Sequence, residues 1–401
     1  MTELKRTIGL PLLLLYGLGN ILGAGIYVLI GKVAGEAGMY VPLAFFVAFV
    51  VAGFSAFTYS ELSARYPLAA GEAVYIDEGF HFTTLSRVTG LLIACSGMVS
   101  AATIARGFYG YFNTFIQLPE LVVVAGLVLL LGALTIWGIS ESVVAAASLT
   151  VIEVFGLLLI IWAGSDVLTD LPAHTEVLLP PMQYAVVTGI MLGAFLAFFA
   201  FIGFEDMVNI AEEVKDPQRN LPAAILLALL IATLIYALVA LVAVASVDVE
   251  TLVASKAPLA DVLAATSSIN PQTISFISMI AIVNGALIQL IMASRLFYGM
   301  ANKGWLWRRL SRVDARTHTP VAATVLVVMI TLGLALWFPL EALAKGTSYL
   351  VLIVFALVNA ALILIKRSRP APQGVLNNPL WVPVTGFITC ASLVVFQLLT
   401  A

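Results

Sequence analysis

Eleven apolar segments, each long enough to cross a lipid bilayer, follow one another along this chain of 401 residues. A helix needs about 20 apolar residues to span the hydrocarbon core, and somewhat more if it tilts or breaks. Hydrophobic residues make up 62% of the chain and charged residues 10%, which is more apolar surface than a soluble core could bury. The sequence therefore predicts an all-α polytopic membrane protein, one transmembrane domain over 1–401, with spans at 8–33, 40–65, 84–112, 120–138, 143–164, 182–211, 221–246, 272–300, 320–338, 346–366 and 379–399.

The basic residues predict how the chain crosses the membrane. With a cytoplasmic N-terminus, fourteen Lys and Arg residues fall in inside connections, and three fall in outside ones: Lys32, Lys256 and Lys345. Cytoplasmic loops carry an excess of basic residues, so this bias supports both the orientation and the number of segments. We expect a multi-pass protein of the cell membrane whose N-terminus is inside and, with eleven segments, whose C-terminus is outside.

Two of the apolar segments are interrupted by glycine near their middle. The first contains LGNILGAGIY at 18–27, and the sixth contains FFAFIGFE at 198–205. An unpaired backbone group is costly in hydrocarbon, so a helix is not interrupted there without a reason. Matched interruptions in the two halves of a repeated membrane fold indicate a transporter's binding site. For the first interruption alone, close helix packing by small residues is the alternative.

The positions of the two interruptions also predict an internal repeat. Segments 1–5 (8–164) and 6–10 (182–366) have opposite orientations, because an odd number of segments separates their starts. Inverted repeats of this kind are related by a pseudo-two-fold axis in the membrane plane. The eleventh segment, 379–399, lies outside the repeat.

An unwound helix exposes backbone groups of both charges. Its N–H groups attract an anion, and its freed carbonyls attract a cation or an ammonium group, so an amino acid suits such a break. Gly23, Ala24 and Gly25 lack bulk, which lets a carboxylate approach the backbone closely. We expect further substrate contacts from the residues around the two breaks: Ile21, Ile26, Phe201, Ile202, Gly203 and Phe204.

Four stretches resemble the amino acid–polyamine–organocation (APC) permeases. GLGNILGAGIY at 17–27 looks like their first helix, and YPLAAGEAVY at 66–75 is similar to the loop between their second and third helices. FAFIGFEDMVNIAEEVKDPQRNLP at 199–222 resembles their sixth helix and following loop, nearest to the cationic amino acid transporter branch. ASRLFYGMA at 293–301 looks like the end of their eighth helix.

The resemblance implies the leucine-transporter-like 5+5 inverted-repeat fold, with discontinuous helices 1 and 6, and transport by alternating access. It also implies capture of a carboxylate by the backbone at Gly23–Gly25 and an aromatic lid on the outer side of the site at Phe201. Most members have twelve or more spans, whereas eleven are counted here. A natural short form and a truncated chain would both account for that difference.

Glu153 lies near the middle of the fifth segment, where a charged group is costly and usually functional. In some relatives thought to be proton-coupled, a lysine occupies about this place and faces the unwound part of helix 1. An ionised carboxylate facing the freed carbonyls would be repelled, but a protonated one, or a sodium ion between them, would be tolerated. We interpret Glu153 as a coupling residue; a glutamic acid that only bonds a neighbouring helix is the alternative.

Glu205 and Asp206 directly follow the break in the sixth segment. They could bind the ammonium or a cationic side chain of the substrate, or pair with Arg295 as an inner gate. The gate is favoured because this segment runs inward and places both acids below the break. Polar residues on neighbouring segments are weaker candidates for the pocket, because such groups more often bond other helices: Ser100, Thr103 and Asn284.

The sequence predicts neither a metal site nor a cofactor. The three histidines fall in predicted loops, far apart in sequence, and no nucleotide-binding motif is present. Neither a channel nor a membrane-embedded enzyme is indicated, because no selectivity filter or nucleophile–base pair is apparent. The expected partners are an amino acid or amine substrate, a proton or sodium ion and membrane lipid, without nucleic acid, in an oligomeric state that stays open.

The sequence thus predicts a secondary active transporter of amino acids, in particular a proton-coupled symporter of neutral amino acids. The aromatic and aliphatic residues around the break in the sixth segment favour neutral substrates. An amino acid or polyamine exchanger and uptake of cationic amino acids are the alternatives within the class. A transport-inactive membrane sensor of amino acids is the alternative from another class.

Overall fold

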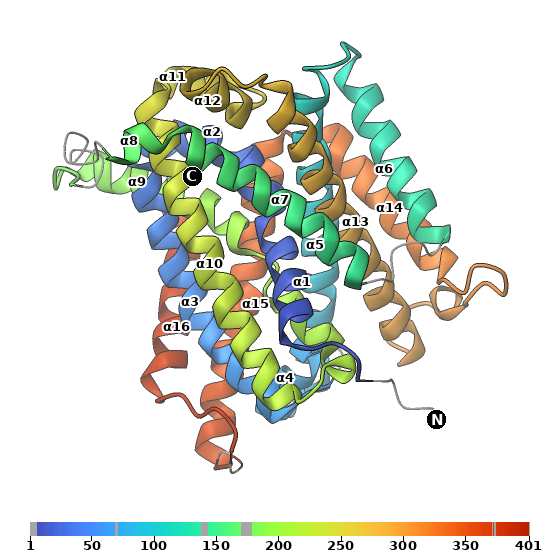
Figure 1. Cartoon of the computed structure of the whole chain (residues 1–401). Helices are drawn as coiled ribbons and strands as arrows, with labels where there is room; N and C mark the ends of the chain where they lie inside the picture. The colour runs from blue at the N-terminus through green and yellow to red at the C-terminus, as the bar shows by residue number, and fades with distance from the viewer. Residues whose placement is uncertain are drawn as a thin grey trace.

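The computed structural model describes residues 6–68, 71–137, 143–169, 179–370, 372 and 374–400, and these form a bundle of helices (Figure 1). Each of the eleven predicted spans corresponds to a helix or to a set of consecutive helices. They are α1 (Leu10–Leu22) with α2 (Ala24–Ala37), α3 (Val41–Arg65), α5 (Thr83–Phe112), α6 (Glu120–Trp137), α7 (Val143–Ala163), α9 (Tyr184–Ala197) with η3 (Phe198–Phe201) and η4 (Glu205–Glu213), α10 (Pro217–Ser246), α13 (Gln272–Asn302), α14 (Val321–Trp337), α15 (Leu340–Ser368) and α16 (Trp381–Thr400).

The connections contain short helices that the sequence did not predict. One of them, α4 (Gly71–Phe80), occupies most of a stretch expected to be a loop, and it packs against α5 and α15. At the opposite end of the bundle lie α11 (Val249–Ala254) and α12 (Pro258–Thr266) (Figure 1). The remaining short elements are η1 (Gly38–Tyr40), α8 (Ser165–Thr169) and η5 (Arg308–Ser311).

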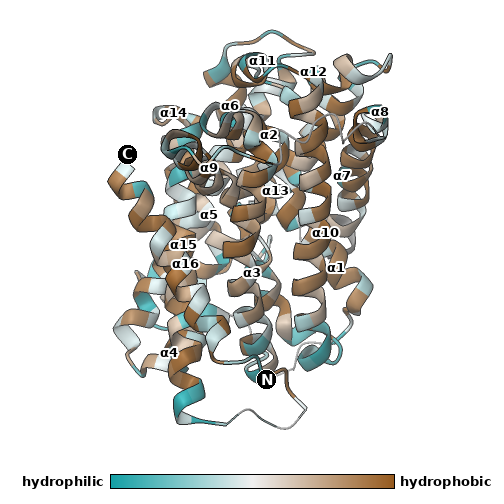
Figure 2. Ribbon diagram, turned by 90° about the vertical axis from the view of Figure 1, so that its left-hand side faces the viewer, coloured by the Kyte–Doolittle hydropathy of each residue, from teal (hydrophilic) through white to brown (hydrophobic). Residues whose placement is uncertain are grey.

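The surface of the bundle suits a membrane. Apolar residues run along the helices, and hydrophilic residues gather mainly toward the two ends (Figure 2). Within the described residues, nine apolar stretches are long enough to cross a bilayer; the first includes both α1–α2 and α3, and α14 is a shorter apolar helix. The expectation of a multi-pass membrane protein is therefore confirmed.

Helices of the first half pack against their counterparts in the second half. The pairs are α3 with α10, α5 with α13, and α6 with α14. Contacts between non-equivalent helices also occur in matching pairs: α1 of the first half packs against α10 of the second, and α9 of the second half packs against α3 of the first. This pairing is what a pseudo-two-fold axis between inverted halves requires. The exact division into 8–164 and 182–366 stays a prediction.

The helices form two groups joined by two connecting helices. The first group holds both broken helices, with α3 and α10 beside them, and the second consists of α5, α6, α13 and α14. The first connecting helix, α7, packs against α1, α10 and α13, and the second, α15, packs against α3, α5 and α9. The broken helices therefore have other helices on several sides, which allows irregular backbone to exist at this depth.

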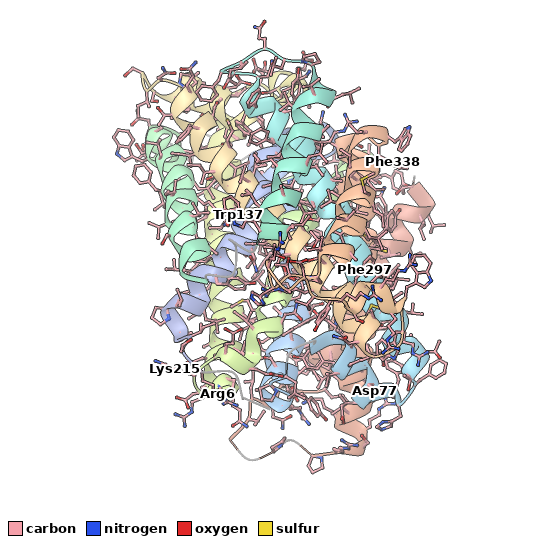
Figure 3. All side chains as sticks on the ribbon, turned by 90° about the vertical axis from the view of Figure 1, so that its right-hand side faces the viewer. Arg6, Asp77, Trp137, Lys215, Phe297 and Phe338 are labelled. Atoms are coloured by element: carbon pink, nitrogen blue, oxygen red, sulfur yellow. The ribbon has the colours of Figure 1, made fainter. Side chains whose placement is uncertain are left out.

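One end of the bundle gathers many of the basic residues, and we call it the basic end. Arg65 ends α3, Lys366 lies in the last turn of α15, and Lys303 follows α13. Figure 3 labels Arg6, Lys215 and Asp77 at this end.

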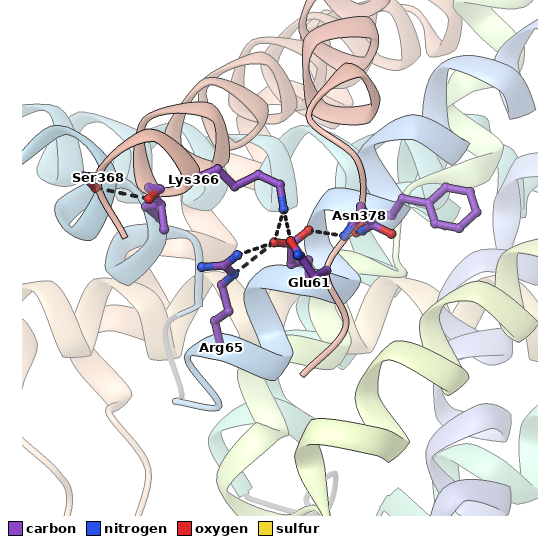
Figure 4. Close-up of polar contacts among 8 residues, drawn as sticks. Glu61, Arg65, Lys366, Ser368 and Asn378 are labelled. Atoms are coloured by element: carbon purple, nitrogen blue, oxygen red, sulfur yellow. Dashed lines mark hydrogen bonds and ion pairs between the residues drawn. The ribbon is translucent and has the colours of Figure 1, made fainter. Parts of the chain in front are cut away.

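At the basic end the fully buried carboxylate of Glu61 contacts residues of three segments (Figure 4). Its Oε1 lies 2.7 Å from Arg65 Nη2 and 2.5 Å from Lys366 Nζ, and its Oε2 accepts the backbone N–H of Asn378 at 2.8 Å. These contacts join α3, α15 and the segment that leads into α16. A buried charge with several donors is stable because its lost hydration is replaced.

Two further ion pairs join helices toward the opposite end. Arg106, which has no obvious partner in the sequence, lies 2.6 Å from Glu120 and donates to the carbonyl of Ala335 at 2.7 Å. Lys345 on α15 lies 3.0 Å from Glu36 at the end of α2. The first pair joins helices of the second group, and the other connects a broken helix to α15.

Candidate functional site

The two broken helices touch at their breaks. The first is interrupted at Gly23, between α1 and α2, and the sixth at Gly203, whose φ of +128° favours glycine. A Cβ atom on Gly203 would lie 2.6 Å from the carbonyl oxygen of Asn20, and one on Gly25 would lie 2.4 Å from the Cα of Ala200. Close packing and helix interruption are therefore both present, and the small residues serve both.

Tyr236 of α10 connects the two breaks. Its buried hydroxyl lies 2.6 Å from the carbonyl oxygen of Ile21 and 3.0 Å from that of Ala200, so its proton is shared between one carbonyl of each broken helix. Tyr236 is not among the contact residues predicted from the sequence. Its signal was present, because Tyr236 is the one aromatic residue in the aliphatic span 221–246.

A small cavity lies between the two breaks, and we call it the central cavity. Its volume is 20 Å³, room for about one water molecule, so an amino acid requires the helices to move apart. Five of the predicted contact residues line it: Ile21, Gly23, Gly25, Ser100 and Ile202. The sequence analysis missed the other lining residues, which are Asn20, Ile104, Phe199, Gly285, Ile288 and Gln289.

Phe201 does not line the central cavity and packs instead among aromatic rings beside the second break. Phe201 is buried with its ring centroid 5.3 Å from that of Tyr236 and 6.3 Å from that of Phe45. The expected role of Phe201 as an aromatic lid on the outer side of the site stays a prediction. Phe204 packs instead between Tyr59 and Phe355, with centroids 5.6 Å and 5.2 Å away.

The lining of the central cavity does not include three other predicted contacts, Ile26, Thr103 and Gly203. Ile26 is fully buried in α2, and Thr103 donates its hydroxyl to the carbonyl of Val99 within α5. The side chain of Ala24 lies outside the described part of the chain. Their proposed contacts with substrate therefore stay predictions without support from this conformation.

Glu153 and Asn284 form a buried pair beside the first break. The Asn284 amide donates to Glu153 Oε1 at 3.0 Å, while Oε2 has no hydrogen-bond partner among the described residues. A Cβ on Gly19 of α1 would lie 2.1 Å from Thr150 Oγ1 and 3.6 Å from the Asn284 amide nitrogen, so the pair lies against α1 just before its break. Asn284 thus contacts the candidate coupling residue and is absent from the lining of the central cavity.

A larger cavity opens toward the basic end, and we call it the vestibule. Its volume is 380 Å³, and its wall includes Tyr16, Glu72, Asp206, Asn209, Arg295 and Trp305. A constriction of 10 Å³, the neck, lies between the vestibule and the central cavity. The neck shares Glu72 and Asp206 with the vestibule and Ser100, Ile202 and Gln289 with the central cavity. The three spaces are therefore neighbours, arranged between the breaks and the basic end.

The two acids that follow the second break take different partners. Glu205 Oε2 accepts the backbone N–H of Gly203 at 2.8 Å, and Asp206 Oδ2 accepts the Gln289 amide at 3.3 Å. Asp206 and Arg295 line the same vestibule, and their pairing as a gate stays a prediction. No group of acids, histidines and cysteines among the described residues could hold a metal ion.

Two discontinuous helices that touch at the centre of paired inverted halves, with a cavity lined by both, are typical of the leucine-transporter-like fold. A solved structure of MhsT in complex with L-phenylalanine shares this fold. The match has a TM-score of 0.68, covers 99% of both chains and has 14% sequence identity. The predicted fold class is therefore confirmed.

The amino acid permease family model matches residues 8–400, and the chain belongs to this family within the APC superfamily. It is 30% identical over 398 residues to cationic amino acid transporter 2, vacuolar, of Arabidopsis thaliana, spanning 92% of this chain and 61% of that protein. It is 27% identical over 400 residues to the branched-chain amino acid permease BcaP of Bacillus subtilis, spanning 92% and 82% of the two chains. The chain therefore spans about three-fifths of the length of the plant relative.

Proposed function

We propose that this protein carries an amino acid across the cell membrane by alternating access, with the substrate bound between the two helix breaks. The observation that carries the proposal is the Tyr236 hydroxyl, which lies within 3.0 Å of one carbonyl from each broken helix beside a cavity lined by both. A substrate that bonds both breaks would stabilise one arrangement of the two helices over another. That differential binding is what moves a carrier between its states.

The backbone at the first break suits the substrate's carboxylate. The N–H groups at Gly23–Gly25 begin α2, where the helix dipole favours negative charge. The carbonyls that the second break leaves unpaired would receive the ammonium group. The first break attracts a negative group and the second attracts a positive one. An amino acid carries both charges and can bridge the two breaks, whereas a compound with a single charge cannot.

The state of the two ends supports an inward-facing conformation. The positive-inside rule assigns the basic end to the cytoplasm, and the vestibule opens toward that end. On the other side, the rings of Phe201, Phe45 and Tyr236 pack together, and the Lys345–Glu36 pair joins α15 to α2. In this conformation substrate would leave to the cytoplasm.

Neutral amino acids are the substrates that the central cavity favours. Most of the side chains that enclose it are aliphatic or aromatic, including Ile104, Phe199 and Ile288. The branched-chain substrates named for BcaP fit such a lining. Uptake of cationic amino acids is the second candidate, and the specific observation that favours it is the group of carboxyls in the neck.

Proton coupling is assigned to Glu153. The side chain is buried against α1 just before the break, and one of its oxygens has no partner among the described residues. A protonated Glu153 could donate its O–H to a carbonyl freed at the break, whereas an ionised one would be repelled by it. Gain and loss of the proton would therefore favour different positions of α1, which is the two-state element that coupling needs.

Ligand binding and flux test the proposal together. Thermal unfolding of the purified protein with each proteinogenic amino acid and several polyamines, at mildly acidic and neutral pH, identifies what binds the folded state. Counterflow of the labelled ligand into proteoliposomes then distinguishes a carrier from a transport-inactive sensor. Stabilisation by amino acids with counterflow supports the proposal. A response to amines alone would contradict the assignment of Gly23–Gly25 to a carboxylate. Binding of amino acids without flux would indicate a transport-inactive sensor instead of a carrier.

A further inference from the structure

Three carboxyl groups from two segments line the neck between the central cavity and the vestibule. Glu205 and Asp206 come from η4, and Glu72 comes from α4, more than a hundred residues away in sequence. All three are buried, with exposed fractions of 8%, 3% and 3%. A gate formed only by η4 and Arg295 leaves Glu72 without a role.

The acids of the neck lack a matching positive charge within it. None of the described residues that line the neck is basic; Arg295 and Lys303 line the vestibule beyond it. The contacts described for these carboxyls are with neutral groups, the Gly203 N–H and the Gln289 amide. Buried carboxylates are costly unless a cation pairs with them, so this region favours entry of a positive group.

A second observation also indicates a ligand. The Tyr59 hydroxyl is fully buried, lines the same neck and lies near the Glu72 carboxyl, but it makes no hydrogen bond of normal geometry to any described residue. A buried hydroxyl without a partner is unfavourable in a packed interior. Ser96, Ser100 and Gln289 add further oxygen acceptors to the wall. The neck thus offers carboxyl and hydroxyl oxygens around one space.

The chemistry of the site favours an ammonium group over a metal ion. The described residues contain no set of three acidic or other metal-binding side chains arranged to hold a metal. An ammonium group has three N–H donors and bonds acceptors at about 2.8–3.0 Å. The oxygens around it are therefore spaced more widely than those around a metal ion. Because the neck borders both the central cavity and the vestibule, the ammonium of a passing substrate is the natural ligand.

We propose that the neck is an ammonium-binding subsite on the route to the basic end, formed by Glu72, Glu205 and Asp206 with the Tyr59 hydroxyl. The proposal rests on the proposed amino acid transport and adds a second binding position to it. It replaces the expected role of the two η4 acids as a gate with direct contact to substrate. The ammonium has two possible sources: the α-ammonium of any amino acid, or the side-chain ammonium of a dibasic one.

Equilibrium binding to the full-length purified protein tests the subsite. The ligands are leucine, lysine and cadaverine, which carry an α-ammonium, both kinds of ammonium, and ammonium groups without a carboxylate. The variants are Asp206→Asn and Glu72→Gln, which keep the shape of the side chain, and the matched control is Glu250→Gln, an exposed acid of α11. The proposal predicts that both neck variants raise the Kd of lysine and cadaverine by about tenfold, while the control leaves it unchanged.

The Kd of leucine shows which ammonium group of the substrate binds in the neck. A Kd for leucine that rises with that of lysine assigns the subsite to the α-ammonium, and an unchanged one assigns it to the side-chain ammonium. The proposal is overturned if correctly folded neck variants bind all three ligands as the control does. Absence of amino acid binding and flux in the unaltered protein would instead overturn the proposed function.

A measurement on the unaltered protein covers the case in which the variants do not fold. Cadaverine should displace bound lysine, whereas glutarate, which has the same five-carbon chain with a carboxylate at each end, should not. Equal displacement by the two compounds would show that the neck does not select positive charge.

Discussion

The hydroxyl of Tyr236 lies 2.6 Å from the carbonyl oxygen of Ile21, the residue just before the end of α1. The same hydroxyl lies 3.0 Å from the carbonyl of Ala200 on η3. One side chain of an unbroken helix therefore holds both breaks in register. A substrate that binds between the breaks must either displace the Tyr236 hydroxyl from these carbonyls or bind while the contact is kept.

Replacing Tyr236 by phenylalanine should destabilise the protein and slow transport. The change leaves two buried carbonyls without their donor, which costs about 1–3 kcal/mol. Thermal unfolding of the purified protein and counterflow into proteoliposomes measure the two effects. Tyr184→Phe is the matched control, because Tyr184 is 83% exposed at the start of α9. Identical unfolding and flux in the two variants would show that the contact does not hold the breaks.

Replacing Gly203 by alanine should abolish transport. The residue has φ of +128°, where an L-residue is strained, and the new Cβ would lie 2.6 Å from the Asn20 carbonyl oxygen. Backbone strain of this kind costs about 1–3 kcal/mol, and the contact between the breaks must also open. Gly126→Ala in α6 is the control, because a Cβ there meets no atom within 4 Å. Flux in Gly203→Ala equal to that of the control would contradict the geometry of the second break.

Replacing Glu61 by glutamine should lower stability strongly. The side chain is fully buried against Arg65 and Lys366, and loss of its charge leaves both cations without their anion. Breaking a buried pair on one side costs about 3–5 kcal/mol. Glu341→Gln, whose carboxylate is 44% exposed and pairs with Lys345, should cost about 1 kcal/mol or less. Equal unfolding temperatures for the two variants would contradict the structural role of Glu61.

The vestibule should be accessible from the cytoplasm. In a background with Cys95 and Cys390 replaced by alanine, Asn209→Cys in the vestibule should react with a membrane-impermeant maleimide added from the cytoplasmic side only. Gln117→Cys, in the exposed connection between α5 and α6, should react from the outside only. Reversed labelling of the two would overturn the orientation assigned by the positive-inside rule.

The sequence was sufficient for the fold and for the positions of the two helix breaks, because both signals are local. A glycine in an apolar helix is visible in the sequence, and a break in hydrocarbon has few explanations besides a binding site or close packing. The spans were likewise predicted within a few residues because bilayer thickness sets their length. Gly23 and Gly203 accordingly mark the breaks that the structure shows.

The parts that the sequence did not predict depend on contacts between distant residues. Tyr236 is 215 positions from Ile21, and although it is the one aromatic residue of its span, its sequence context does not show that its hydroxyl reaches both breaks. Glu72 lies on α4, a helix of 10 residues that is too short for the rule of bilayer length to detect. Asn284 was expected in the pocket, but its amide bonds Glu153, which only the packing of α13 against α7 decides.

Glu153 is proposed to couple amino acid movement to protons, and substrate-driven proton uptake in proteoliposomes measures this coupling. The unaltered protein should acidify the lumen when its amino acid is added outside. In Glu153→Gln the proton signal should fall to that of empty liposomes, while the Kd of the substrate stays within about twofold, because the central cavity is unchanged. Glu250→Gln is the control. Proton uptake in Glu153→Gln equal to that of the unaltered protein would contradict the account.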